Sequence, residues 1–143
     1  MTANIVSLTQ YPKRGEPGIQ LAKMELLAGI GVRGDSHRGG DRQVSILLAE
    51  AVDWMDAQPE NGLCAGRFRE NIRITGLSPE VIQSGCSLLI GDTVLQITAA
   101  SKYCFDQCRF YSEETVCYFS KGALFATVVQ SGEIRIGDAV FLT

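Results

Sequence analysis

The sequence lacks several features that mark common classes of protein. It contains no run of basic residues, and its net charge at pH 7 is −3. Nucleic acids and anionic membranes both attract clustered positive charge, so we expect neither as the main partner. No apolar run approaches the roughly 20 residues of a membrane-spanning helix. The N-terminus shows no basic segment followed by an apolar one, so no secretory signal is predicted. Five cysteines without such a signal are typical of a reducing compartment, and we predict a cytoplasmic protein.

Motifs for common cofactors are also missing from the chain. Neither the nucleotide-binding GxGxxG pattern nor the phosphate-binding GxxxxGK[ST] pattern is met, and no flavin, haem or iron–sulfur motif occurs. His37 is the single histidine, and the cysteines fit no paired zinc pattern, so we expect no tetrahedral structural zinc site. Any redox chemistry would therefore need an external electron donor.

Three of the five cysteines lie in the segment Ala100–Lys121, at Cys104, Cys108 and Cys117. This segment contains no glycine or proline. Its apolar residues follow neither the two-residue period of a strand nor the 3.6-residue period of a helix, which predicts a loop with a short helix. A thiolate can bind zinc, copper, an iron–sulfur cluster or molybdenum, and it can carry sulfur as a persulfide. Free cysteine is also among the most often buried residues, so a purely structural role stays open for each of the three.

Five glycines fall within Gly29–Gly40. Glycine accepts positive φ and has no Cβ, so such a segment can bring backbone N–H groups close to an anion. Arg33, Arg38 and Arg42 would add positive charge to that surface. The alternative is an ordinary loop with solvated charges.

The remaining chain is rich in short strands. The apolar patterns predict strands at Asn4–Leu8, Ile19–Leu26, Gln43–Leu47, a run that ends at Gly76, and Gly122–Gln130, with a helix at Leu48–Ala57 and a helical turn at Pro79–Gln83. Leu89–Leu95 is echoed by Arg135–Phe141, and each copy places a Gly-Asp turn between two β-rich runs, as in a hairpin or corner. About eight short strands and one clear helix predict a mainly β (α+β) fold, a closed or nearly closed β-barrel with one or two short helices. The length suits a single domain over residues 1–143.

Four short motifs occur in a recognisable order. They are Gly34-Asp35-Ser36-His37 with Arg42-Gln43-Val44-Ser45, then Gly66-Arg67-Phe68-Arg69-Glu70-Asn71-Ile72, then a cysteine before Gly122-Ala123-Leu124-Phe125-Ala126, and finally Gly132-Glu133-Ile134-Arg135-Ile136-Gly137-Asp138. From about Val6 to Phe141 the chain resembles a MOSC domain, named for the C-terminal part of molybdenum cofactor sulfurase. The resemblance implies a β-barrel-rich fold and handling of the molybdenum cofactor (molybdopterin) or its sulfur. Some members of the family reduce N-hydroxylated compounds, so the resemblance also implies this activity as an alternative for the chain.

The resemblance further implies a set of site residues. Cys117 best matches the family cysteine that ligates molybdenum or carries sulfur, and Cys104 is the second choice. Arg69 and Asn71 match a motif that contacts the pterin, while Asp35, His37, Arg42 and Gln43 match the segment that precedes it. Structural roles remain the alternative: a hydrogen-bonded histidine, a capping aspartate, and a surface or turn contact for the Arg-x-Asn pair.

Two functions follow from this resemblance. The favoured one is a molybdenum cofactor-binding or sulfur-carrier module that acts in molybdoenzyme maturation. Its partner would be a pyridoxal phosphate-dependent cysteine desulfurase or a molybdoenzyme. The alternative is a molybdenum-dependent reductase of N-hydroxylated compounds that receives electrons from a separate protein.

Overall fold

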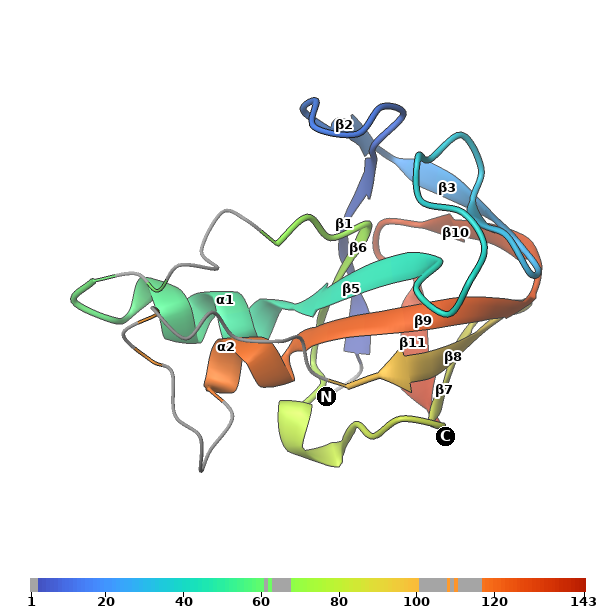
Figure 1. Ribbon diagram of the computed structural model, residues 1–143. Helices are drawn as coiled ribbons and strands as arrows, with labels where there is room; N and C mark the ends of the chain where they lie inside the picture. Colours follow the sequence, from blue (N-terminus) through green and yellow to red (C-terminus); the bar gives the residue numbers. More distant parts are fainter. Residues whose placement is uncertain (1–2, 61, 63–67, 101–107, 109, 111–116) are drawn as a thin grey trace.

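A closed barrel of seven strands forms the body of the protein (Figure 1). The computed structural model describes residues 3–60, 62, 68–100, 108, 110 and 117–143. The barrel strands are β1 (Ala3–Gln10), β5 (Val44–Leu48), β6 (Ile72–Thr75), β7 (Ser87–Ile90), β8 (Thr93–Ala99), β9 (Ala123–Gln130) and β11 (Ala139–Leu142). Their order is β11-β7-β8-β9-β5-β6-β1, and pairing of β1 with β11 closes the ring. This closure confirms the predicted barrel and leaves no open edge within the ring.

A smaller sheet covers part of the barrel. It consists of β10 (Gly132–Arg135), β3 (Lys23–Leu27) and β4 (Gly31–Val32), in the order β10-β3-β4. Buried side chains of this sheet, including Met24, Leu26 and Ile134, belong to the same apolar core as the barrel interior. A further short strand, β2 (Ile19–Leu21), pairs with the end of β1.

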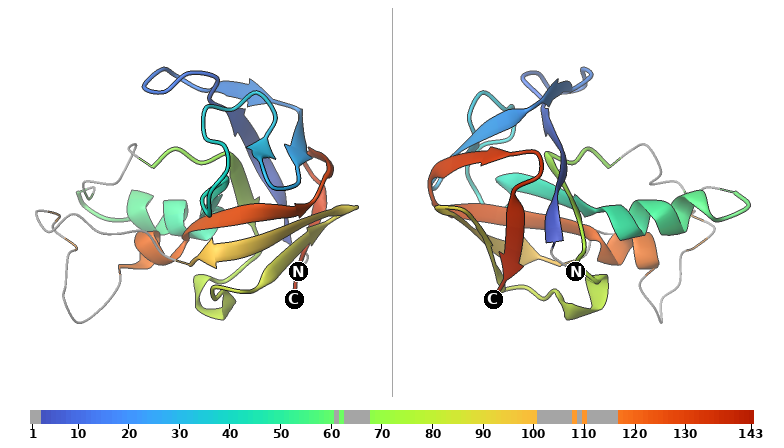
Figure 2. Two further views of the ribbon diagram at one scale, coloured as in Figure 1. Left: turned by 45° about the vertical axis from the view of Figure 1, so that its right-hand side comes forward. Right: turned by 180° about the vertical axis from the view of Figure 1, so that it is seen from behind.

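Two short α-helices lie side by side at one side of the barrel (Figure 2). They are α1 (Ala49–Asp56), directly after β5, and α2 (Tyr118–Lys121), directly before β9; a 3₁₀ turn, η1, covers Pro79–Val81. A second apolar cluster that includes Leu47, Met55 and Phe119 joins them. Gly122 ends α2 so close to α1 that an added Cβ would lie 2.4 Å from the Cβ of Ala51.

The two copies of the Gly-Asp repeat have different structures. Gly91 and Asp92 form the two-residue loop of the β7–β8 hairpin, and positive φ at Gly91 alone follows the type II′ pattern. In the second copy, β10 and β11 belong to different sheets, so Gly137, with φ +91°, turns a corner between them. The carboxylate of Asp138 accepts the backbone N–H of Arg135 at 2.8 Å and holds this corner.

The prediction of one continuous strand at Ile19–Leu26 was wrong. The chain changes sheets at Ala22: β2 pairs with β1, whereas β3 pairs with β10 and β4. The carbonyl of Ala22 accepts the backbone N–H of Ile136 from the corner described above. This change of partners is a tertiary event that strand propensity cannot signal.

Within the described residues, no helix has the length and apolar character that crossing a membrane requires.

Candidate functional site

A cavity of about 360 Å³ brings together four of the six predicted cofactor-binding residues. Its described lining residues are His37, Arg42, Ser45, Phe68, Arg69, Asn71 and Phe125. They come from three separate stretches: the glycine-rich loop before β5, the segment that leads into β6, and the neighbouring strands β5 and β9. In β5 and β9, Ser45 is the direct partner of Phe125. The sequence motifs therefore converge because the barrel order places β9, β5 and β6 next to one another.

Asn71 holds this convergence together as a buried brace. It is 2% exposed, and its side-chain amide donates to the carbonyl of Thr9 (3.1 Å) and to Asp35 Oδ1 (3.0 Å). Its Oδ1 accepts from the backbone N–H of Ser45 (3.1 Å) and lies 3.0 Å from the Ser45 hydroxyl. Both amide hydrogens and both acceptor positions are thus occupied by protein groups. Asn71 fixes the wall of the cavity, and its amide hydrogens are already used.

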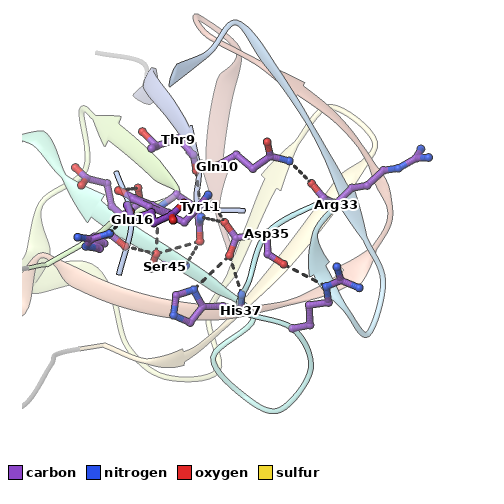
Figure 3. Close-up of polar contacts among 12 residues, drawn as sticks. Thr9, Gln10, Tyr11, Glu16, Arg33, Asp35, His37 and Ser45 are labelled. Atoms are coloured by element: carbon purple, nitrogen blue, oxygen red, sulfur yellow. Dashed lines mark hydrogen bonds and ion pairs between the residues drawn. The ribbon is translucent and has the colours of Figure 1, made fainter. Parts of the chain in front are cut away.

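Asp35 contacts His37 and orients it (Figure 3). Its carboxylate is fully buried; Oδ1 accepts the backbone N–H of Tyr11 at 2.8 Å, and Oδ2 accepts that of His37 at 3.0 Å. The imidazole Nδ1 of His37 lies 3.3 Å from the same Oδ2. Asp35 thus shapes the loop that carries the cavity histidine, while its predicted contact with the cofactor stays a prediction.

Two guanidinium groups supply positive charge to the cavity. That of Arg42 stacks on the ring of Phe125, 4.6 Å from the ring centre. That of Arg69 lies 5.7 Å from the ring centre of Tyr11 and donates to the carbonyl of Glu16. A guanidinium carries five N–H donors, so both arginines keep donors for an anionic ligand.

The other charges of the glycine-rich loop are engaged elsewhere. Arg33 forms an exposed ion pair with Glu25 at 2.9 Å, and Arg38 donates to the carbonyl of Asp35 at 3.2 Å. The backbone N–H of Ser36 donates to Tyr11 and that of Gly39 to Ile30. Because these backbone N–H groups already have partners, we expect the side chains at the cavity to bind an anion rather than these backbone groups.

Gln43 does not line the cavity. Its side chain is turned into the protein, where Oε1 accepts the backbone N–H of Val128 and Nε2 donates to the carbonyl of Gly40, both at 3.0 Å. With 5% exposure, Gln43 clamps the end of the glycine-rich loop to β9. Its proposed contact with the cofactor stays a prediction.

A second cavity, of about 270 Å³, adjoins the first and shares His37 and Arg69 with it. Its remaining lining residues are Tyr11, Lys13, Arg14, Gly15 and Ser36. The hydroxyl oxygen of Ser36 is buried and has no hydrogen-bond partner among the described residues. The adjacent Lys13 and Arg14 are the signal in the sequence that could have indicated this basic pocket.

Tyr11 lines both the second cavity and a third. Burial raises the pKa of its phenol above the usual 10.0, Glu70 and Asp35 add to this effect, and Arg69 and Arg73 oppose it. The phenol donates to the carbonyl of Glu70 at 3.2 Å. Tyr11 therefore acts as a neutral hydrogen-bond donor in the wall of the site.

The third cavity, of about 370 Å³, has a mixed lining that includes the charged residues Asp56, Glu70 and Arg73. It lies between the segment that leads into β6 and the two helices, and its apolar lining includes Leu47, Val52, Met55, Phe68 and Phe119. Arg69 lines all three cavities. The three spaces thus meet around a single guanidinium-bearing side chain.

Cys117 is the N-cap residue of α2, where its Sγ accepts the backbone N–H of Ser120 at 3.4 Å. It packs against the second apolar cluster and is not among the described residues that line the first cavity. Cys104 lies outside the described residues. No group of three or more His, Cys, Asp or Glu suited to a metal ion occurs in the described part of the chain. The role of Cys117 as a molybdenum ligand or sulfur carrier stays a prediction.

Comparison with known proteins agrees with this architecture. The protein is similar in structure to the YuaD protein from Bacillus subtilis, with a TM-score of 0.70 and 17% identity over 99% of this chain and 96% of that one. It is also similar to YiiM from Geobacillus stearothermophilus (TM-score 0.66, 19% identity, 99% and 75% covered) and to YiiM from Escherichia coli (0.62, 18%, 98% and 69%). At these identities the likeness concerns the fold.

A search of curated proteins found no match. The family model named MOSC domain matches residues 33–141, a stretch that begins in the glycine-rich loop and contains every described lining residue of the first cavity. The chain therefore belongs to the MOSC domain family, which is associated with molybdenum cofactor-related functions.

Proposed function

We propose that this protein binds the molybdenum cofactor and acts as a cofactor-binding or sulfur-carrier module in molybdoenzyme maturation. The observation that carries the proposal is the first cavity, where His37, Arg42 and Arg69 converge from sequence motifs far apart in the chain. We further propose that the chain works as one domain in the cytoplasm, with a cysteine desulfurase or a molybdoenzyme as partner.

The residues of the two basic cavities fit the organic part of the cofactor. A pterin that bears a phosphate needs hydrogen-bond donors and positive charge, which Arg42 and Arg69 supply around the first cavity. In the second, Lys13 and Arg14 supply positive charge, and the hydroxyl of Ser36, which has no partner in the described part of the chain, supplies a donor. Because the cavities share His37 and Arg69, we assign the phosphate to the second cavity and the pterin to the first.

The bound cofactor would supply the molybdenum centre at which sulfur is exchanged or electrons are transferred. The chain's own part is to bind and orient it. Stacking of Arg42 on Phe125 and the contact of Arg69 with Tyr11 limit the freedom of both guanidinium groups. Arginines held in this way lose less entropy on forming a charge-assisted hydrogen bond. We assign the thiolate function to Cys117, with Cys104 as the second candidate.

The alternative function, reduction of N-hydroxylated compounds, is favoured by the third cavity. Its wall, which combines apolar side chains such as Met55 with charged ones, offers space for a polar organic substrate next to the cofactor cavity, with Arg69 and Phe68 lining both. This reaction would take its electrons from an external protein donor.

The cofactor-binding proposal is tested by analysing natively purified protein for molybdenum and for bound pterin. Arg69→Ala should lower cofactor retention by about ten- to a hundredfold, since a charge-assisted hydrogen bond is worth about 1.5–3 kcal/mol. Arg135→Ala is the matched control, because Arg135 is exposed and pairs with Glu133 on the smaller sheet. Equal retention in the parent and both variants would show that the first cavity does not hold the cofactor.

The cysteine assignment is tested with Cys104→Ser, Cys108→Ser and Cys117→Ser, made separately. Each is assayed for molybdenum content and for persulfide after incubation with a cysteine desulfurase. We expect that only Cys117→Ser loses one of these properties, and the property lost distinguishes a metal ligand from a sulfur carrier. If all three variants match the parent, the cysteines are structural.

A further inference from the structure

His37 has an environment suited to moving a proton. Its side chain is 50% exposed, whereas that of Asp35 behind it is completely buried. The ring lines both basic cavities, and its Nδ1 lies 3.3 Å from Asp35 Oδ2. One ring nitrogen therefore faces a buried carboxylate, which leaves Nε2 as the nitrogen that a ligand can reach.

The partners of Asp35 determine which ring nitrogen carries hydrogen. The backbone N–H groups of Tyr11 and His37 and the side-chain amide of Asn71 all donate to this carboxylate, at 2.8–3.0 Å. A carboxylate surrounded by donors acts only as an acceptor. The ring must then present Nδ1–H to Asp35, because a lone pair on Nδ1 would face a lone pair on Oδ2. A neutral His37 in this arrangement has a free lone pair on Nε2.

We propose that His37 is the proton-transfer residue of this site and that Asp35 is its positioning residue. When a ligand oxygen needs a proton, the Nε2–H bond of the imidazolium breaks and the proton passes to that oxygen. The ring becomes neutral, its Nδ1–H stays on Asp35, and the carboxylate remains ionised throughout. In the reverse direction Nε2 accepts a proton from the ligand. The inference rests on the proposed function only for the identity of the ligand.

The surrounding charges couple this proton to anion binding. Among the residues that the structure describes, the titratable and charged groups that face His37 or its cavities are Asp35, Tyr11, Lys13, Arg14, Arg38, Arg42 and Arg69. An anion that enters the cavities adds negative charge next to Nε2 and favours the protonated ring. We therefore expect His37 to take up a proton when an anion binds.

The tautomer can be read directly, because this chain has one histidine. Protein labelled with ¹⁵N-histidine is examined by long-range ¹H–¹⁵N correlation while the pH is varied. We expect the neutral ring to carry hydrogen on Nδ1 and not on Nε2, the opposite of the tautomer preferred by free histidine. Asp35→Asn, which replaces one acceptor oxygen by an NH₂ group, should shift the ring towards the Nε2–H form. If Asp35→Asn does not fold, the tautomer in the parent protein still decides the point.

Coupling to a ligand is measured with inorganic phosphate as the probe. Phosphate affinity of the parent should fall by roughly tenfold as His37 loses its proton, the size expected for one charge-assisted hydrogen bond. In His37→Gln, which keeps a polar side chain of similar length, affinity should be weak and follow only the ionisation of phosphate itself. Arg33→Gln removes a loop charge that is paired with Glu25 and should keep the pH dependence of the parent.

Three results would overturn the proposal: an Nε2–H tautomer in the parent protein, no phosphate binding at any pH, or a pH dependence that His37→Gln leaves unchanged. These outcomes are distinct from failure of the proposed function. A protein that retains no molybdenum or pterin, but passes the tautomer and phosphate tests, would keep the proton-transfer assignment and lose only the cofactor.

Discussion

Replacing Asn71 by alanine tests whether this residue is a structural brace. The substitution removes two neutral hydrogen bonds, from Asn71 to the carbonyl of Thr9 and from the backbone N–H of Ser45 to Asn71, worth about 1 kcal/mol each. It also removes the charge-assisted bond to Asp35, worth about 2 kcal/mol. The Ser45 hydroxyl loses little, because the carbonyl of Arg69 lies 2.8 Å away as an alternative acceptor. We expect a loss of about 4 kcal/mol in the free energy of unfolding.

The effect should be large against the total stability of a single domain, about 5–15 kcal/mol. For a chain of this size it corresponds to a decrease in Tm of roughly 12 °C. The assay is urea unfolding followed by fluorescence of Trp54, the one tryptophan, together with a thermal melt. The control is Asn4→Ala on β1, because the Asn4 side chain makes no hydrogen bond among the described residues, and it should lose less than about 1 kcal/mol. If Asn71→Ala is no less stable than Asn4→Ala, the brace is wrong and a direct ligand contact becomes the better explanation.

Three other substitutions test separate features of the fold. Tyr11→Phe should reduce the loss of stability as pH rises above the usual tyrosine pKa of 10.0. The phenol of the unfolded chain ionises first, so the folded state, in which the pKa of the phenol is raised, loses stability relative to the unfolded state at high pH. Urea unfolding at a series of pH values tests this, and parallel curves of stability against pH for parent and variant would contradict burial of the phenol. Gly137→Ala should cost about 1–2 kcal/mol from its φ of +91° alone, since open space surrounds the site, and an unchanged Tm would contradict the strained corner. Gly122→Ala, at φ −90°, should lower the free energy of unfolding by about 1–3 kcal/mol, because the new Cβ would clash with the Cβ of Ala51. Calorimetry that shows no loss of stability would mean that the two helices move apart without cost.

Local patterns predicted the barrel because they report on elements whose residues are close in sequence. The Gly-Asp repeat at Gly91 and Gly137 marked two turns through the need for positive φ, and the helix predicted at Leu48–Ala57 forms as Ala49–Asp56. The same signals could not show that one repeat closes a hairpin while the other turns between sheets, since both have the same local chemistry. Nor could they show that Ile19–Leu26 divides between two sheets. The partners of each strand are selected by the whole barrel.

The sequence motifs predicted His37, Arg42 and Arg69 as site residues, and all three line one cavity. How the side chains around them are used depends on the tertiary structure. The motifs predict Asn71 and Gln43 as ligand contacts, and only the structure shows that their amides also bond to protein groups, such as the carbonyl of Thr9 and the backbone N–H of Val128. Lys13 and Arg14 look like loop charges, and the pairing of β1 with β2 and β6 brings them to the same cavity as His37 and Arg69. A side chain's hydrogen-bonding capacity is fixed by its chemistry, but whether protein or ligand fills it depends on groups distant in sequence, and only folding brings those groups together.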